Sequence, residues 1–369
     1  MAKIIVSVTN DLLTDQRVHK VCTSLFQAGH EVTLVGRRLE NKSKLSREYK
    51  TFRMPLLFNK TFLFFTEYNI RLFFYLLFKK ADLFLSNDTD TLLANYLASS
   101  IRNKPLLFDA HEMFPELPEL FGRPKVKRIW ERIEDFIFPK LKYSYTVCQS
   151  IAEEYKTKYG INMEVVRNIP FEKKKQSIAK PTENEKLKNK KIILYQGAVN
   201  IGRGIEWMID AMTYLDDYVF LVVGGGDILE ELKAKVDKQK LNDRVIFTGR
   251  VPFEELSSYT TMADIGINLL ENKGLNYYYS LPNRIFDLTR NCIPILATDF
   301  PEVRRIVQQY NLGILIDHYE SEYLAEKVKE LMNNIPPLEG FHQANKDLTW
   351  EKESTTILKL VDKALRRLV

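Results

Sequence analysis

Apolar runs and amphipathic stretches alternate through the first 168 residues. The run at residues 3–8 is rich in β-branched side chains and predicts a strand. A helix is expected at about residues 14–28, because apolar residues recur there at the spacing of one helical face. Ser150 and Glu153 match a capping box and predict the start of another helix. Further strands are predicted at residues 31–35, 83–86, 105–110 and 143–148. This alternation is typical of a parallel sheet covered by helices on both faces.

The pattern restarts after a polar, lysine-rich stretch, which we interpret as a linker at residues 169–190. Strands follow at residues 192–196, 218–223, 245–248, 264–270 and 293–297, with helices at 205–212 and 228–240. We therefore predict an α/β fold class with two Rossmann-like doubly wound domains facing a central cleft. The domains are residues 1–168 and 191–351, and the last helix, about 352–369, packs back on the first domain or caps the second. Ligands of such sheets bind beyond the carboxyl ends of the strands.

Composition and charge narrow the class of protein. The hydrophobic share of 45% and the charged share of 28% exclude a disordered chain. Three scattered cysteines without a CxxC pair argue against a disulfide framework or zinc knuckle and favour a reducing cytoplasm. The first residues are not typical of a signal peptide. Residues 1–168 hold 26 Lys and Arg against 19 Asp and Glu, a balance of +7, whereas the whole chain has a net charge of +6, so the excess of positive charge lies in the first half. Such an excess suits anionic membranes, phosphorylated substrates or nucleic acid, or serves solubility alone.

Two polar motifs follow strands of the first half. Asp15 and Arg17, in the segment after the first strand, are expected on the acceptor side of the cleft; the alternative is a helix N-cap with solvated charge. No GxGxxG fingerprint is present there. His111 and Glu112 end the 105–110 strand, which makes His111 a catalytic candidate and Glu112 an acceptor-side one, with a structural role as the alternative. Pro115 breaks an HExxH zinc motif.

The triplet Asp88-Thr89-Asp90 has the spacing of a metal-binding DxD motif. It also precedes a helical segment, where an N-cap acid and a first-turn acid are stabilised by the helix dipole. We expect this second role, and therefore no metal and no cofactor.

Two motifs of the second half carry the candidate chemistry. In the turn Gly197–Gly204, small residues allow a ligand to approach the backbone, and Arg203 presents a guanidinium suited to phosphate. Pro282 is expected at the first position of a helix whose free amides would hold a diphosphate. Arg284 adds charge, and Asp287 could accept two hydrogen bonds from a ribose diol. The turn 224–226 is glycine-only and is a weak phosphate signal.

Together these segments resemble glycosyltransferase family 4, the GT-B group of retaining sugar transferases. The resemblance covers nearly the whole chain and rests on residues 10–17, 109–112, 195–204, 247–251 and 281–287. It implies that Arg203 binds the donor diphosphate, that Asp287 binds ribose, and that His111 lies near the sugar. Catalytic roles are thus expected for His111, Arg203 and Arg284. The expected donor-binding set is Gly197, Arg203, Gly204, Arg250, Val251, Ser280, Leu281, Asn283, Arg284 and Asp287.

The resemblance implies a metal-independent hexosyltransferase that moves a sugar from a nucleotide-diphosphate sugar to a hydroxyl, in cell-surface polysaccharide or lipid-linked glycan synthesis. The partners are then the donor and a glycan or lipid-linked acceptor, with no nucleic acid. Tyr279 and Ala198 stand where many members carry an acid and a second basic residue. Two alternatives follow: a nucleotide-sugar 2-epimerase of the same fold, and a non-catalytic glycosyltransferase-like scaffold.

An aromatic segment, residues 58–78, holds nine aromatic residues in 21 positions. Polar residues interrupt it, so a transmembrane span is not expected. It is either a helix buried on the first sheet or an interfacial helix that rests weakly on a membrane. Trp130, Phe136 and Phe138 could add to such a face. The predicted location is cytoplasmic and peripheral on the inner face of the cell membrane.

Overall fold

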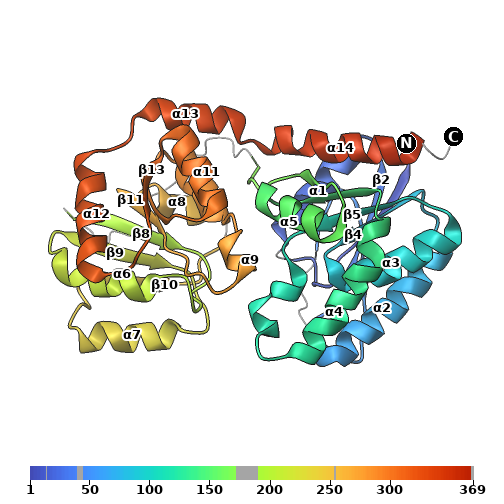
Figure 1. Ribbon diagram of the computed structural model, residues 1–369, viewed down its shortest axis with the longest axis horizontal. Coiled ribbons are helices and arrows are strands. Elements are labelled where there is room, and N and C mark those ends of the chain that lie inside the picture. Colours follow the sequence, from blue (N-terminus) through green and yellow to red (C-terminus); the bar gives the residue numbers. More distant parts are fainter. Residues whose placement is uncertain (14, 40–44, 172–189, 253–254, 367–369) are drawn as a thin grey trace. The chain divides into compact units, whose positions relative to one another are not determined.

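The computed structural model describes residues 1–13, 15–39, 45–171, 190–252 and 255–366. The chain divides into two domains, each built around its own parallel sheet (Figure 1). The first domain comprises Met1–Phe171 together with Trp350–Val369, and the second comprises Glu172–Thr349. The predicted linker at 169–190 lies almost wholly outside the described residues.

Seven parallel strands form the sheet of the first domain. Buried side chains on both faces of the central strands explain their continuous apolar runs. In spatial order the strands are β3 (Lys50–Met54), β2 (Glu31–Arg37), β1 (Lys3–Ser7), β4 (Leu83–Asn87), β5 (Leu106–Ala110), β6 (Tyr143–Thr146) and β7 (Glu164–Val165). The strand order reverses at β1, so the crevice expected to bind ligand lies at the carboxyl ends of β1 and β4.

Helices cover both faces of this sheet (Figure 1). They are α1 (Gln16–Gln27), α2 (Thr61–Phe78), α3 (Thr89–Arg102), α4 (Pro124–Ile137), α5 (Gln149–Tyr159) and α14 (Trp350–Arg366), with short 3₁₀ turns η1 (Phe114–Glu116), η2 (Pro118–Leu120) and η3 (Phe138–Lys140). Helices α2, α3 and α4 lie side by side on one face, and α1 packs against α14 on the other. Trp350 of α14 is buried in the first domain's core and donates to Ser24 at 2.8 Å.

The second domain repeats this design with six parallel strands. In spatial order these are β10 (Val245–Gly249), β9 (Tyr218–Val223), β8 (Lys191–Gln196), β11 (Ile265–Asn268), β12 (Ile295–Thr298) and β13 (Gly313–Ile316). Its helices are α6 (Ile205–Ala211), α7 (Leu229–Lys238), α8 (Leu256–Thr260), α9 (Leu275–Tyr278), α10 (Asn283–Arg290), α11 (Pro301–Tyr310), α12 (Ser321–Asn333) and α13 (Leu338–Asp347), with the 3₁₀ turn η5 (Met212–Tyr214). The order again reverses at the first strand, which places a ligand crevice at the carboxyl ends of β8 and β11.

Two predicted helix starts are wrong by a residue or two. Helix α5 begins at Gln149, because Cys148 is extended and already occupies the N-cap; Ser150 therefore lies inside the first turn and forms no capping box. Pro282 is the N-cap of α10 rather than its first residue, since its ψ of 140° is extended. Asn283, Arg284 and Asp287 consequently lie in the first two turns of α10.

Candidate functional site

Arg17 and Asp109 form a buried ion pair at the carboxyl edge of the first sheet. The Nε and Nη2 atoms of Arg17 donate to Asp109 at 3.1 and 2.7 Å, and Nη1 donates to the Val166 carbonyl at 2.9 Å. Both side chains are buried, at 4% and 0% exposure. Desolvation opposes the charge of Asp109, but Arg17 and His111 outweigh it and lower the pKa of Asp109 to about 2. Arg17 therefore holds Asp109 in place, and its role on the acceptor side stays a prediction.

His111 contacts a carboxylate with each ring nitrogen. Nδ1 lies 3.1 Å from Asp88 and Nε2 lies 3.1 Å from Asp109, while the His111 amide donates to Asp88 at 2.8 Å. Desolvation opposes the imidazolium, but the two carboxylates outweigh it and raise the pKa of His111 above its usual value. Only a doubly protonated ring donates at both nitrogens. With both N–H groups directed at carboxylates, His111 is thus suited to supply positive charge, not to act as a general base.

Asp88 is at the N-cap of α3, yet its side chain makes no cap bond. Its carboxylate faces His111 instead, and its backbone has φ 58° and ψ 167°, a strained conformation for a residue other than glycine. Asp90 accepts from Thr9 at 2.6 Å, and burial raises the pKa of Asp90 to about 7. The expected helix-start role therefore holds for the position of both acids but not for the Asp88 side chain. Within the described residues, no group of three or more His, Cys, Asp or Glu side chains could hold a metal ion.

The two remaining acceptor-side candidates differ in role. Asp15 caps α1: one carboxylate oxygen accepts from the Val18 amide at 2.9 Å, and the other accepts from Asn10 at 2.6 Å. The N-cap alternative is thus confirmed for Asp15. Glu112 is half-buried beside His111, and its carbonyl accepts from Tyr155 at 3.4 Å. Burial is the main cause of the raised pKa of Asp90, and the negative charge of Glu112 raises that pKa further.

In the second domain, Arg284 lies against the glycine turn that follows β8. A Cβ atom on Gly197 would be 3.3 Å from Arg284 Nη2, so glycine leaves the guanidinium room at this turn. Arg284 stacks over Tyr195, with Cζ 4.1 Å from the ring centroid, and donates to the Tyr195 hydroxyl at 3.1 Å. Burial lowers the pKa of Arg284, and the positive charge of Arg203 lowers it further. Two guanidinium groups therefore repel each other here, and an anion bound between them would relieve that repulsion.

Both arginines present nitrogens that lack partners. Arg284 Nη1 and Arg203 Nε are buried and have no hydrogen-bond partner among the described residues. Arg203 lies over the Tyr277 ring at 4.9 Å, and the turn continues into α6 through Gly204, whose φ is 71°. A side chain at Gly204 would collide with the Leu269 carbonyl. Buried donors without partners are costly, and an anion bound at this turn would satisfy both of them.

Asp287 and the remaining donor-side candidates surround this turn. One carboxylate oxygen of Asp287 accepts from Gln196 at 3.0 Å, and Gln196 in turn accepts from Thr260 at 2.8 Å. Arg250 is exposed after β10, and its side chain lies against Gly225, where a Cβ would be 2.9 Å from Arg250 Cγ. The other predicted residues lie as follows: Val251, Ser280 and Leu281 are half-buried, Asn283 is exposed, and the Ser280 hydroxyl donates to the Tyr277 carbonyl at 2.8 Å.

Family models match both domains. The model described as Glycosyltransferase Family 4 matches residues 15–170, and the model described as Glycosyl transferases group 1 matches residues 176–347. The chain belongs to glycosyltransferase family 4.

Curated relatives of this family 4 chain are distant. An alpha-D-kanosaminyltransferase of Streptomyces kanamyceticus is 24% identical over 40% of this chain and 38% of its own length. An alpha-monoglucosyldiacylglycerol synthase of Streptococcus pneumoniae is 26% identical over 38% of this chain and 30% of its own length. A GDP-mannose-dependent phosphatidylinositol monomannoside mannosyltransferase of Mycobacterium tuberculosis is 25% identical over 35% of each chain. The family 4 chain thus spans only about a third of the length of these relatives.

Solved structures show the fold. Sucrose-phosphate synthase from Thermosynechococcus elongatus superposes with a TM-score of 0.77 at 17% identity, over 100% of both chains. Anabaena HepE in complex with UDP-glucose superposes with a TM-score of 0.73 at 13% identity, over 98% of this chain and 100% of that one. The two parallel-sheet domains of this family 4 chain therefore form the GT-B fold.

Sequence reasoning missed three residues that hold candidate site residues in place. Gln196 and Thr260 orient Asp287, and Asn87 places its side-chain oxygen 3.2 Å from His111 Nε2. Gln196 and Asn87 are each the last residue of a buried strand that leads into a motif, and a polar residue at such a place is a signal that could have found them. Thr260 comes from α8, and no local pattern marks it.

Proposed function

We propose that this family 4 member is a retaining glycosyltransferase of hexosyltransferase type that uses a nucleotide-diphosphate sugar. The observation that carries the proposal is the pair Arg203 and Arg284, whose buried Nε and Nη1 atoms lack partners beside the turn at Gly197. A diphosphate matches the charge and the donor geometry of two guanidinium groups. Anabaena HepE, which has the same fold, binds UDP and UDP-glucose, and this supports the donor class.

The proposed mechanism follows the charges of the reaction. Breaking the bond between sugar and phosphate places negative charge on the leaving diphosphate and positive charge on the sugar. Arg203, Arg284 and the N-terminus of α10 would stabilise the diphosphate, as preorganised donors do in other active sites. Asp287, held by Gln196, would accept hydrogen bonds from the ribose hydroxyls. The leaving phosphate would help to deprotonate the acceptor hydroxyl on the same face, which retains the configuration of the sugar.

For the acceptor we propose a growing surface polysaccharide or a lipid-linked glycan, met on the cytoplasmic side of the membrane. Two of the curated relatives described above have a lipid in their names, which supports this choice. In the first domain, His111 would contribute positive charge near the sugar, and no hydrogen bond, because Asp88 and Asp109 already occupy both of its ring nitrogens.

Nucleotide binding tests the donor site directly. Thermal shifts with UDP, GDP, dTDP and ADP should single out one base, since a ligand at 100 times its Kd adds about 2.7 kcal/mol of stability. Asp287→Asn should weaken binding of that nucleotide about tenfold, because an amide is a poorer acceptor for two hydroxyls than a carboxylate. Asp216→Asn is the matched control, since Asp216 is exposed and pairs with Arg244. Equal nucleotide affinity in Asp287→Asn and in the wild type would refute the ribose role.

Incubation with the sugar form of the selected nucleotide then separates the candidate activities. Transfer to an added acceptor supports the proposal, and an α-linked product from an α-linked donor supports retention. Epimerised donor would assign a 2-epimerase, and nucleotide binding without turnover across an acceptor panel would assign a scaffold.

Activity should persist in excess EDTA. Asp88 contacts His111, and one oxygen of Asp90 accepts from Thr9, so each of these acids already has a protein partner. The two arginines supply the charge that a metal would otherwise bring. The measurement is the initial rate of transfer with EDTA, with magnesium and with manganese. Activity lost in EDTA and restored by either metal would contradict metal independence and move Asp88-Thr89-Asp90 into the site.

A further inference from the structure

Helix α2 is apolar on two opposite faces. Four of its side chains, spaced four residues apart, are buried: Phe64, Tyr68, Leu72 and Leu76. A second series with the same spacing points outward, and its apolar members are Phe62 at 71% exposure, Ile70 at 54%, Phe74 at 53% and Phe78 at 77%. A surface helix of a soluble domain normally turns a polar face outward. Packing on the sheet therefore explains only half of the aromatic segment.

The neighbouring helices extend this apolar surface. On α3, Leu97 and Ile101 are exposed at 40% and 64%, and on α4, Ile129 and Phe136 are exposed at 55% and 53%. Helix α3 packs against both α2 and α4, and the three lie side by side (Figure 1). We call their outward side the α2–α3–α4 face. Of the sequence candidates for this face only Phe136 belongs to it, because Trp130 and Phe138 are buried.

Positive charge borders the α2–α3–α4 face. Residues 60–80, 89–104 and 124–142 together hold twelve Lys and Arg but five Asp and Glu, of which Asp90 and Glu134 are buried. On α4, exposed Lys125, Arg128 and Arg132 alternate with Ile129 and Phe136. Lys60 precedes α2, and Lys79 and Lys80 follow it. Apolar side chains flanked by cations are typical of surfaces that bind anionic membranes.

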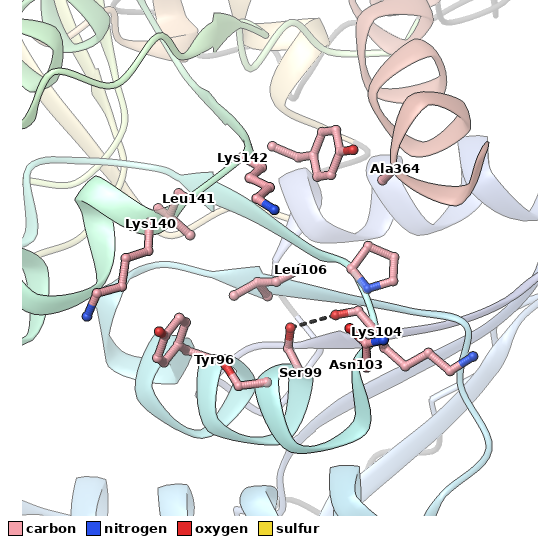
Figure 2. Close-up of a pocket in the computed structure, with 12 residues that line it drawn as sticks. Tyr96, Ser99, Asn103, Lys104, Leu106, Lys140, Leu141, Lys142 and Ala364 are labelled. Atoms are coloured by element: carbon pink, nitrogen blue, oxygen red, sulfur yellow. Dashed lines mark hydrogen bonds between the residues drawn. The ribbon is translucent and has the colours of Figure 1, made fainter. Parts of the chain in front are cut away.

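A basic pocket adjoins this face (Figure 2). Its volume is about 460 Å³, and it lies where β5 and β6 begin, at the edge of the sheet opposite His111. Lys104, Lys140 and Lys142 line it, together with Tyr96, Ser99, Ser100, Asn103, Pro105, Leu106, Leu141, Tyr143 and Ala364. Tyr96 packs edge-on against Phe136 at 5.8 Å, and Lys140 lies over the Phe136 ring at 3.2 Å. The pocket therefore meets the apolar face at Phe136.

We propose that the α2–α3–α4 face docks on an anionic phospholipid bilayer, with its aromatic side chains in the interface and a lipid phosphate group among the lysines of the pocket. The exposed apolar series supplies the hydrophobic contribution, and the cations supply the electrostatic one. The N-terminal half of α2 lies at the carboxyl edge of the sheet, because Tyr68 donates to the Val8 carbonyl at 2.6 Å. A bilayer on this face would lie along the domain that holds His111. The inference goes beyond the proposed sugar transfer and does not depend on the nucleotide site.

Vesicle sedimentation tests this docking with the full chain. The wild type should bind vesicles of phosphatidylcholine and phosphatidylglycerol, bind pure phosphatidylcholine much more weakly, and lose affinity as salt screens the charges. Phe74→Ser with Phe78→Ser should reduce binding at least about tenfold, since two exposed rings can no longer insert. Lys140→Gln with Lys142→Gln should weaken binding to anionic vesicles while leaving the weak binding to neutral vesicles unchanged.

The matched control is Ile335→Ser with Leu338→Ser, which removes two side chains of comparable exposure from the second domain. This control should bind vesicles like the wild type. All variants should keep the thermal shift with nucleotide, and this second measurement separates failure of docking from failure of the donor site. Equal loss of binding in the control and in Phe74→Ser with Phe78→Ser would overturn the proposal. A second result would also overturn it: the wild type does not bind anionic vesicles but forms a dimer, and Phe74→Ser with Phe78→Ser does not form that dimer. The face would then bind a second copy of the chain.

Discussion

Arg203→Ala is expected to lower the rate of sugar transfer by about 10² to 10³, the usual cost of removing one preorganised donor from a developing anion. Arg203 Nε is buried without a partner beside Arg284, so Arg203→Ala breaks no hydrogen bond of that nitrogen within the fold, and the loss of rate falls on the leaving diphosphate. Arg203→Lys should recover only part of the rate, because an ammonium keeps the charge but loses the planar fork. The measurement is kcat and KM for the donor with all three proteins.

Arg304→Ala provides the control for that experiment. Arg304 belongs to the same domain, but it is half exposed and pairs with Asp299 at the surface. Its removal should leave transfer within a factor of about two, since an exposed pair contributes little. If Arg203→Ala retains as much activity as Arg304→Ala, the diphosphate is held elsewhere and the assignment of the donor turn is wrong.

Arg17→Leu should destabilise the first domain by about 3–5 kcal/mol, the usual cost of removing one partner from a buried ion pair. Asp109 would keep its charge at 0% exposure and lose two hydrogen bonds from Arg17. Multidomain chains do not unfold in a single step, so the signal has to report one domain. In a Trp207→Phe background, the remaining tryptophans, Trp130 and Trp350, both report the first domain in urea unfolding.

Lys50→Leu is the comparison for this loss. Lys50 also pairs with an acid, Glu31 at 2.7 Å, but Lys50 is 71% exposed, and such a pair contributes about 0–1 kcal/mol. The double variant Arg17→Leu with Asp109→Asn should recover part of the stability, because the uncompensated charge is gone. A loss of less than 1 kcal/mol in Arg17→Leu would mean that Asp109 is neutral in the fold, contrary to its low pKa.

The periodicity of the chain predicted the central strands and the two-domain α/β fold, but it missed β3, β7 and β13. All three are edge strands. Their residues alternate between exposed and partly buried positions, or have few buried positions at all, so they show no continuous apolar run. The central strands β1, β4 and β5 are nearly all buried on both faces, and local sequence alone therefore marks them.

The aromatic segment shows the same limit in a helix. Its composition indicated either a buried helix or an interfacial one, and the fold makes α2 both. Tyr68 and Leu72 face the domain core, while Ile70 and Phe74 face outward. Helical periodicity cannot distinguish two apolar faces, because the choice of which face is buried depends on the sheet that the helix meets.

The sequence by itself determined the family, the two sheets and the places where chemistry could occur, because strand ends, glycine turns and helix starts are local features. Tertiary structure alone decided which side chains meet there. Arg17 and Asp109 are 92 residues apart, and Gln196 and Asp287 are 91 apart, yet each pair is in contact. Parallel strands bring residues distant in the chain to one edge of a sheet, and burial there decides which charges are paired with the protein and which remain for a ligand.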